Sequence, residues 1–184
     1  MEYFSRGGFT MLKRSQMLGR LTEGKFVMAV AGTHGKTTTT TLTAWLNHVC
    51  TGGGSAFLGG ISKNFDSNLV LGAGTRMAVE ADEFDRSFLR LYPDAAVVTS
   101  ADADHLDIYG THEAVKQAFS QFIAQIKAGG ALIIKEGVDV KIDNDKITVY
   151  RYSVGGSADF RAENIRPTKG GHYRFDIVCP DRTI

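Results

Sequence analysis

The 184-residue sequence has little cysteine, little proline and almost no net charge. Its two cysteines, Cys50 and Cys179, are too few for a disulfide framework and lack the spacing of metal ligands. We therefore expect both to behave as small buried apolar side chains. The formal net charge of +1 gives no electrostatic reason to expect nucleic acid or an anionic membrane surface as a partner. A hydrophobic content of 43% excludes a disordered segment of low hydrophobicity.

Long apolar runs are also missing from the chain. The longest, residues 26–31 and 95–98, fall far short of the roughly 18 residues that are needed to cross a bilayer. The first ten residues contain no apolar core like that of a signal peptide, so we expect a cytoplasmic protein. Glycine, in contrast, is abundant, with 21 residues against three prolines.

Apolar segments alternate with helical segments through the middle of the chain. Continuous apolar runs predict buried strands of a parallel sheet at residues 25–31, 76–80, 95–99 and 131–134. A helix is predicted from the end of the segment 32–37 to about Val49, and a second helix should begin after an N-cap at Thr111. In the second helix the apolar residues recur at helical spacing and form one face: Val115, Ala118, Phe119, Phe122, Ile123 and Ile126. This order of elements indicates an α/β fold with a doubly wound, mostly parallel sheet.

Three other stretches have a different pattern. Residues 1–24 are expected to be a lead-in or interdomain linker with one short helix over residues 11–21, followed by a domain at residues 25–184. Residues 51–60 hold five glycines and predict a loop around one short strand. From about residue 138, apolar and polar residues alternate with tight turns between the runs. That alternation predicts a small antiparallel β extension of the sheet.

A glycine turn between the first predicted strand and its helix is the strongest functional signal. Residues 32–37 read Gly-Thr-His-Gly-Lys-Thr, a shortened P-loop, because the full spacing would require glycine at Val30. Glycines let backbone amides turn toward a polyphosphate, and the helix N-terminus adds partial positive charge. Lys36 can reach the β and γ phosphates, and the Thr37 hydroxyl can bind Mg²⁺. We predict that the nucleotide is held by seven residues: Gly32, Thr33, His34, Gly35, Lys36, Thr37 and Thr38.

Acidic runs follow two other predicted strands, at residues 80–85 and 102–107. Ligands of open α/β sheets bind beyond the carboxyl ends of the strands, so both runs should lie on the same rim as the glycine turn. Mg²⁺ prefers oxygen ligands, which makes Glu80 a candidate, and His105 lies among acids on this rim. His48 and His112 lack such neighbours and are expected to be surface or capping residues. These residues predict a nucleotide site with a divalent metal but leave the reaction open.

Three motifs in sequence order resemble the ATP-binding central domain of the Mur ligases. They are Ala-Gly-Thr-His-Gly-Lys-Thr-Thr-Thr at 31–39, Val-Glu-Ala-Asp-Glu-Phe-Asp at 79–85 and Thr-Ser-Ala-Asp-Ala-Asp-His-Leu-Asp at 99–107. The segment at 12–19 is also similar to the stretch that precedes the phosphate loop in that family. The resemblance covers nearly the whole chain. Two positions depart from it, since the family often has Asn at Ser100 and Glu at Asp102.

The resemblance implies an ATP-dependent, ADP-forming carboxylate–amine ligase of peptidoglycan precursor synthesis. Its closest match within the family joins L-alanine to UDP-N-acetylmuramate through an acyl phosphate. Lys36, Glu80 and His105 would be the catalytic residues, with Lys36 on the β and γ phosphates and Mg²⁺ held by Thr37, Glu80 and His105. A sister ligase that adds a preformed peptide, a folylpolyglutamate synthase, a P-loop kinase or NTPase without ligation, and a silent nucleotide-binding module are the alternatives.

Mur ligases have three domains, and this sequence resembles one of them. We expect the N-terminal UDP-binding domain and the C-terminal ligase domain to be absent and the central domain to be cut short, without the family's His-Asn-x-x-Asn segment. The missing domains would be partners of this chain, along with its small-molecule substrates. By itself the chain should fold, bind ATP and Mg²⁺ weakly, and show no turnover. The roles of His34, Lys63 and Asn64 stay open.

Overall fold

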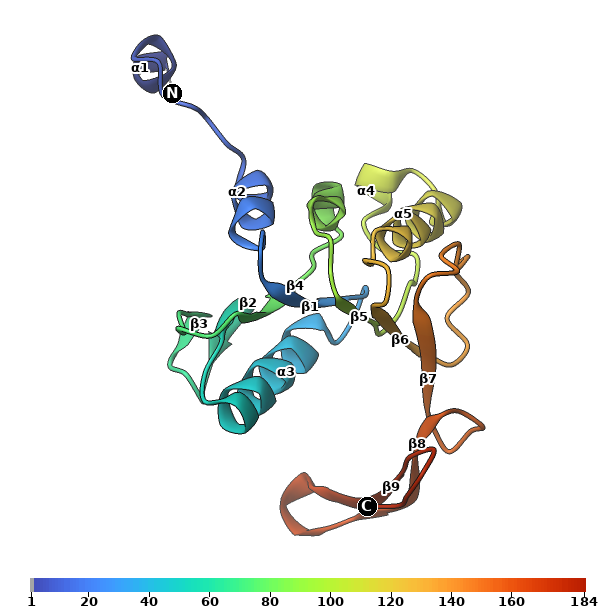
Figure 1. The fold of residues 1–184 in the computed structure, drawn as a ribbon. Coiled ribbons are helices and arrows are strands. Elements are labelled where there is room, and N and C mark those ends of the chain that lie inside the picture. Colours follow the sequence, from blue (N-terminus) through green and yellow to red (C-terminus); the bar gives the residue numbers. More distant parts are fainter. Residues whose placement is uncertain (1) are drawn as a thin grey trace.

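A single nine-stranded sheet runs through the computed structural model, which describes residues 2–184 (Figure 1). Met1, the first residue of the expected lead-in, lies outside the described residues. The strand order across the sheet is β3-β2-β4-β1-β5-β6-β7-β8-β9. The strands are β1 (Phe26–Ala31), β2 (Ser55–Ser62), β3 (Ser67–Val70), β4 (Arg76–Glu80), β5 (Ala95–Val98), β6 (Ala131–Lys135), β7 (Thr148–Val154), β8 (Phe160–Pro167) and β9 (Tyr173–Val178).

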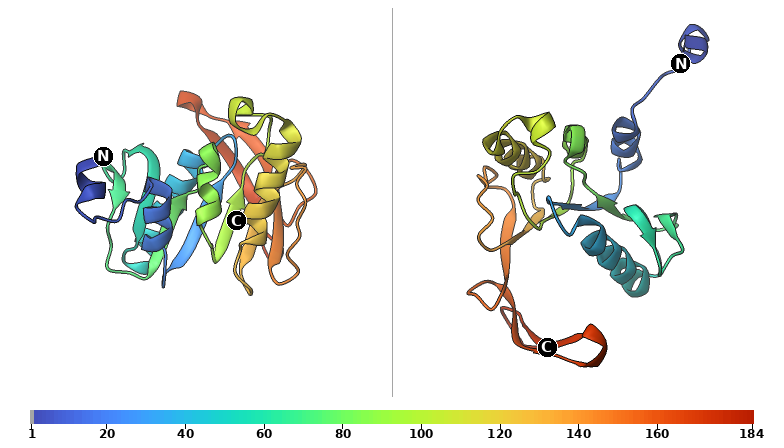
Figure 2. Two further views of the ribbon diagram at one scale, coloured as in Figure 1. Left: turned by 90° about the horizontal axis from the view of Figure 1, so that it is seen from above. Right: turned by 180° about the vertical axis from the view of Figure 1, so that it is seen from behind.

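Helices lie on both faces of the sheet, as the doubly wound prediction requires (Figures 1 and 2). One face carries α3, and the other carries α2, the short helix η1, α4 and α5. The α-helices are α1 (Glu2–Arg6), α2 (Arg14–Leu21), α3 (Lys36–Thr51), α4 (Leu106–Tyr109) and α5 (His112–Ala124). Two 3₁₀ segments complete the set, η1 (Phe84–Arg90) and η2 (Lys169–Gly171). No helix in residues 2–184 is long and apolar enough to cross a membrane.

The four predicted central strands are confirmed to within one residue at each end, and their neighbours pair in parallel. β1 lies between β4 and β5, and β5 pairs with β6. Because these strands are parallel, their carboxyl ends all meet at one edge of the sheet. The predicted fold class, a mostly parallel α/β sheet, is therefore confirmed.

Helix α5 closes the core on one face of the sheet. Its N-cap is Thr111, whose hydroxyl accepts a hydrogen bond from the amide of Ala114 at 3.2 Å. The predicted apolar stripe is buried throughout, with exposures of 0–3%, although its last residue, Ile126, lies beyond the end of α5. Phe119 and Phe122 pack against Phe88 of η1, with ring centroids 5.3 and 5.1 Å apart. This aromatic cluster ties the segment after β4 to α5.

Residues 51–60, where we predicted a loop around a short strand, contain most of a regular strand despite their five glycines. β2 has eight residues, includes Gly59 and Gly60, and forms a hairpin with β3, which the sequence analysis missed. Nearby glycines permit close backbone approach, since a Cβ on Gly72 would lie 2.6 Å from the carbonyl oxygen of Gly54. In this segment glycine allows a tightly packed sheet edge.

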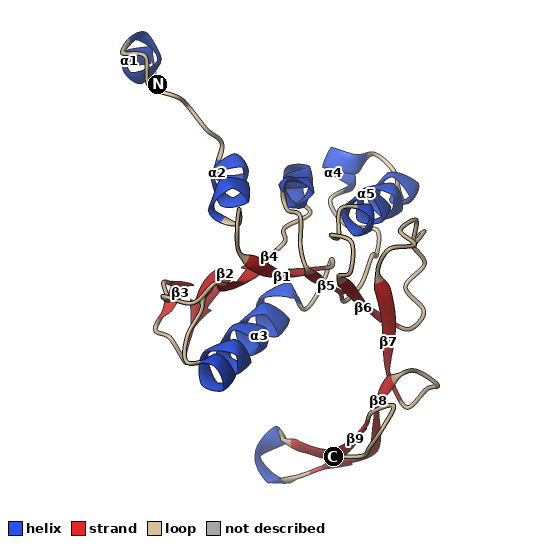
Figure 3. Ribbon diagram, in the orientation of Figure 1, coloured by secondary structure: helices blue, strands red, loops and turns tan. Residues whose placement is uncertain are grey.

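The C-terminal part differs from the prediction in its pairing. The alternating residues Val138, Val140 and Ile142 form no strand and instead pack as partly buried side chains against the core. β7 pairs in parallel with β6, and a three-residue register joins β8 in parallel with β7. Antiparallel pairing of this extension begins only between β8 and β9 (Figure 3). Alternation of apolar and polar residues indicates a strand with one buried face, but it does not indicate whether the strand pairs in parallel or antiparallel.

Two smaller expectations also need correction. The helix in the lead-in begins at Arg14 instead of residue 11, and a further short helix, α1, precedes it. Cys50 is exposed on the last turn of α3, so the expected burial is wrong there, while Cys179 is half-buried. The extent of the lead-in and of the domain after it stays a prediction.

Replacing Phe119 by alanine tests the aromatic cluster. Phe119 is fully buried, so Phe119→Ala should lower the free energy of unfolding by about 3–5 kcal/mol through lost burial and a residual cavity. Urea denaturation followed by circular dichroism measures this loss. Leu42→Ala, at a side chain that is 58% exposed on α3, is the control and should change stability by less than about 0.5 kcal/mol. Equal effects of the two substitutions would contradict the assigned core.

Candidate functional site

The chain between β1 and α3 forms a tight loop that favours glycine at two positions. Gly32 has φ +139°, and a Cβ on it would lie 2.0 Å from the Thr99 hydroxyl oxygen. Gly35 has φ +79° and precedes the first residue of α3, Lys36. Both conformations are in the range that side-chain-bearing residues rarely adopt. The loop thus presses against the end of β5 and leads directly into the N-terminus of α3.

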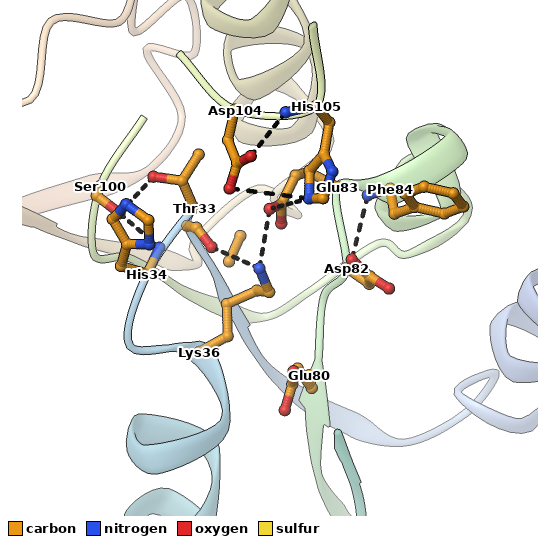
Figure 4. A network of polar contacts seen from close by, with 12 residues as sticks. Thr33, His34, Lys36, Glu80, Asp82, Glu83, Phe84, Ser100, Asp104 and His105 are labelled. Carbon is orange, nitrogen blue, oxygen red and sulfur yellow. Dashed lines mark hydrogen bonds and ion pairs between the residues drawn. The ribbon is translucent and has the colours of Figure 1, made fainter. Parts of the chain in front are cut away.

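Side chains after β5 hold this loop in place (Figure 4). The amide of His34 donates to the Ser100 hydroxyl at 2.9 Å, and the hydroxyls of Thr33 and Ser100 lie 2.8 Å apart. The amide of Asp102 donates to the Thr33 hydroxyl oxygen at 3.2 Å. Ser100 and Asp102 are the two positions that depart from the expected motif, and both bond to the loop. The His34 ring is exposed, with Nε2 3.9 Å from Asp102 Oδ2.

Lys36 folds back over the loop. Its Nζ donates to the Gly32 carbonyl oxygen at 2.9 Å and to Glu83 Oε1 at 2.8 Å. The side chain of Lys36 is 15% exposed and that of Glu83 is 1% exposed. The ammonium is therefore held at the mouth of the loop by a buried carboxylate, where it can meet an anion.

Glu83 is the residue that the sequence analysis did not single out. It lies in the acidic run after β4, but its side chain turns inward and its Oε1 is also 3.6 Å from Nε2 of His105. The buried hydroxyl of Tyr109 donates to the backbone carbonyl of Glu83 at 2.6 Å. The other carboxylate oxygen, Oε2, is buried without a hydrogen-bond partner. Nothing in the spacing of four acids within six residues indicates which one is buried.

Glu80 forms a second pair beside the first. Its Oε1 accepts from the Thr37 hydroxyl at 3.0 Å, and its Oε2 accepts from the amide of Gly59 at 2.7 Å. A Cβ on Gly59 would lie 2.2 Å from the Glu80 carboxylate, so the glycine makes room for it. The carboxylate is clamped between β2 and the first turn of α3.

His105 belongs to the segment that follows β5 and precedes α4. It has φ 52°, and its amide donates to Asp104 Oδ1 at 2.8 Å. Its ring meets Phe84 edge-on, with centroids 5.5 Å apart, and its Nε2 lies 4.0 Å from Asp104 Oδ2. The structure thus brings Lys36, Glu83 and His105 together, while Thr37 and Glu80 form a separate pair at the same edge of the sheet.

The donor set suits a magnesium–phosphate complex. Among residues 2–184, no three His, Cys, Asp or Glu side chains cluster in a way that could enclose a metal ion. Mg²⁺ does not require such a cage, because it binds one or two protein oxygens and takes its remaining ligands from phosphates and water. The hydroxyl of Thr37 and the carboxylate of Glu80 are oxygens of that kind. The unpartnered Glu83 Oε2 adds a buried negative charge nearby.

The remaining candidates lie outside this group. His48 is exposed on α3, with its ring centroid 6.0 Å from that of Trp45, and His112 Nε2 lies 2.9 Å from the Ala101 carbonyl oxygen. Lys63 and Asn64 are exposed in the turn between β2 and β3. Both histidines are therefore surface residues, and the N-cap beside His112 is Thr111.

The chain matches a model of the Mur ligase middle domain over residues 30–182. A UDP-N-acetylmuramate–L-alanine ligase of Phocaeicola vulgatus is 49% identical over 181 residues, which are 97% of this chain and 39% of that protein. The chain thus spans 39–40% of the length of two curated relatives that it matches.

Solved structures give the same picture of the fold. A murein peptide ligase from Psychrobacter arcticus superposes with a TM-score of 0.77 at 25% identity, over 100% of this chain and 44% of that one. A MurF ligase from Thermotoga maritima, solved in complex with ADP, has a TM-score of 0.67 at 16% identity, over 96% of this chain and 44% of that one. At 16% identity the second likeness concerns the fold alone.

Tyr109 offers a test of how the buried segment around Glu83 is held. Burial, followed by the negative charge of Glu83, raises the pKa of Tyr109 from 10.0 to about 12. The protonated hydroxyl is therefore favoured in the folded chain, and the stability it contributes is lost as the pH rises from 10 through 12. Tyr109→Phe should lower the free energy of unfolding by about 1 kcal/mol at pH 8, because it removes one of the two hydrogen bonds that the Glu83 carbonyl accepts and leaves only the bond from the Arg86 amide.

Urea denaturation at pH 8 and at pH 11 measures both effects. The variant should lose less stability than the native chain between these two pH values, since the titrating group is gone. Tyr92→Phe, at a ring that is 60% exposed, is the control and should follow the native chain. A Tyr109→Phe variant as stable as the native chain at pH 8 would show that this hydrogen bond contributes nothing.

Proposed function

This chain belongs to the Mur ligase family, and we propose that it is the central, nucleotide-binding domain of a ligase that joins L-alanine to UDP-N-acetylmuramate. The convergence of Lys36, Glu80 and His105 around a glycine loop at one edge of the sheet carries this proposal. Mur ligases are ATP-dependent, and this edge is where a parallel sheet places its ligands. The UDP-binding and ligase domains would lie in the remaining length that the curated relatives have.

The loop residues are proposed to hold the phosphates of ATP. The backbone of Gly32 and Gly35 would supply amides, while Thr33 and His34, whose amides are bonded to Ser100, would line the phosphates and shape the loop. The first turn of α3, with Thr37 and Thr38 exposed, adds its partial positive charge. Lys36 would bind the β and γ phosphates from its place above the Gly32 carbonyl. The short, ordered path from β1 to α3 supports this assignment.

Mg²⁺ is proposed to bind at Thr37, Glu80 and His105. When bound there with ATP, it would neutralise the charge that builds up on the transferred phosphoryl group. The Thr37–Glu80 contact of 3.0 Å already places two oxygen ligands together. His105 lies across the site, next to the Glu83 carboxylate, and would orient its ring nitrogen toward the same phosphate.

The proposed reaction needs positioning more than it needs a protein nucleophile. The carboxylate of UDP-N-acetylmuramate would attack the γ-phosphorus of ATP, releasing ADP and forming an acyl phosphate. The amine of L-alanine would then displace phosphate and form the amide bond. Lys36 would reduce the repulsion between the attacking carboxylate and the polyphosphate, which is the main obstacle to the first step. Without the other domains this chain is not expected to turn over.

Two observations weigh against the alternatives. The 49% identical relative is an L-alanine ligase, which favours that activity over the addition of a preformed peptide, as in the murein peptide ligase of similar fold. A kinase or NTPase without ligation would not explain why His105 and its acidic neighbours lie at this site. The proposed substrates are small molecules of the cytoplasm, and we place the reaction there.

Lys36→Ala tests the nucleotide site. Loss of the ammonium should weaken binding of ATP·Mg²⁺ by at least about tenfold, or about 1.4 kcal/mol, since the β and γ phosphates lose their direct cation. Isothermal titration calorimetry on the 184-residue chain measures the dissociation constant. Lys169→Ala, at an exposed lysine of η2, is the matched control and should bind as the native chain does. Unchanged binding by Lys36→Ala would refute the assignment.

Two neighbouring glycines test the role of Glu80. Gly59→Ala would push the Glu80 carboxylate away from Thr37, whereas a Cβ on Gly60 meets only a Thr37 methyl group at 3.6 Å. Because the Glu80 side chain can rotate away, we expect Gly59→Ala to leave the melting temperature nearly unchanged but to weaken ATP binding several-fold in the presence of Mg²⁺. Calorimetric titrations with Mg²⁺ and with a chelator compare the two variants. If Gly60→Ala and Gly59→Ala behave alike, Glu80 has no special role.

A further inference from the structure

Negative charge dominates the side chains around the phosphate loop. The residues in Figure 4 include the carboxylates of Glu80, Asp82, Glu83 and Asp104 and one side-chain ammonium, that of Lys36. Of the cations near this group, Lys13 pairs with Asp85, the Arg86 guanidinium lies over the Tyr109 ring, and Lys116 pairs with Asp139. A loop that receives a polyphosphate thus lies in an anionic setting.

Glu83 neutralises the one positive charge in this group, that of the Lys36 ammonium. Its carboxylate contacts the Lys36 ammonium at 2.8 Å, and both side chains are largely withdrawn from water. Screening by solvent is weak for such a pair, so an approaching anion meets a nearly neutral dipole at this point instead of a free cation. The partial positive charge of the α3 N-terminus is then the main attraction that the protein itself offers.

The ion pair with Lys36 uses only one of the two carboxylate oxygens of Glu83. Its Oε2 is buried without a partner, which is a costly state for a carboxylate and one that packing alone would not require. An isosteric glutamine would fill the same space, and the Tyr109 hydroxyl bonds to the backbone carbonyl of residue 83, not to its side chain. The negative charge itself is therefore the feature that needs an explanation.

We propose that Glu83 makes this site selective for metal-bound nucleotide over metal-free nucleotide. The inference rests on the proposed nucleotide site and adds a determinant of its specificity. By neutralising Lys36, Glu83 leaves the charge of the phosphates to be balanced by a divalent cation that arrives with them. Metal-free ATP, which brings only negative charge, is rejected by the surrounding carboxylates.

The test compares two dissociation constants for each protein. ATP is titrated calorimetrically with excess Mg²⁺ and with excess chelator, and the ratio of the metal-free to the metal-bound constant measures selectivity. Glu83→Gln should lower this ratio by about tenfold, because Lys36 becomes a free cation that attracts both forms of the nucleotide. Asp85→Asn removes an exposed carboxylate two residues away and should leave the ratio unchanged.

A double variant guards against a folding defect in Glu83→Gln. In Lys36→Gln/Glu83→Gln both charges disappear together, so the pair stays neutral and the selectivity ratio should remain near that of the native chain. Melting temperatures confirm that each variant is folded. An unchanged ratio in folded Glu83→Gln, or an equal fall in the single and double variants, would overturn the inference while leaving the nucleotide site intact. Failure of the native chain to bind ATP·Mg²⁺ at all would overturn the proposed function and this inference with it.

Discussion

The ion pair between Lys36 and Glu83 is the contact on which the rest of the site depends. It joins the loop after β1 to the segment after β4, and its carboxylate also faces His105 at the start of α4. Removing one partner of a buried pair leaves the other charge uncompensated, which costs far more than an exposed pair contributes. The three segments are therefore held in one arrangement by charge as well as by packing.

The parallel sheet makes this arrangement possible. β1, β4 and β5 are neighbours and end at the same edge, so residues far apart in the chain meet there. Lys36 and Glu83 are 47 residues apart, and Thr33 and Ser100 are 67 residues apart, yet both pairs are in hydrogen-bond contact. The buried aromatic rings of η1 and α5 support this edge from behind. The strands and helices that form the core are therefore also the ones that position the site residues.

Periodicity and strand ends allowed much of this to be predicted. The apolar stripe of α5, the central strands and the position of Glu80 follow from spacing alone, because each depends on local pattern. Glu83 could not be predicted, since its burial depends on a turn in which Asp85 and Arg86 take positive φ angles. The direction of β7 and β8 was also beyond the sequence, because alternation describes a face and not a partner. The hairpin of β2 and β3 was not predicted, because the glycines around and within β2 indicated a loop.

The central claim is that polyphosphate binds at the loop between β1 and α3. Backbone amide chemical shifts of the isotope-labelled chain, followed by NMR during titration with ATP·Mg²⁺, test this most directly. The account predicts that the largest shift changes fall at residues 32–38, with smaller ones at Glu80, Glu83 and His105. Changes confined to another surface, such as the hollow lined by Gly19, Arg90 and Lys127, would contradict it.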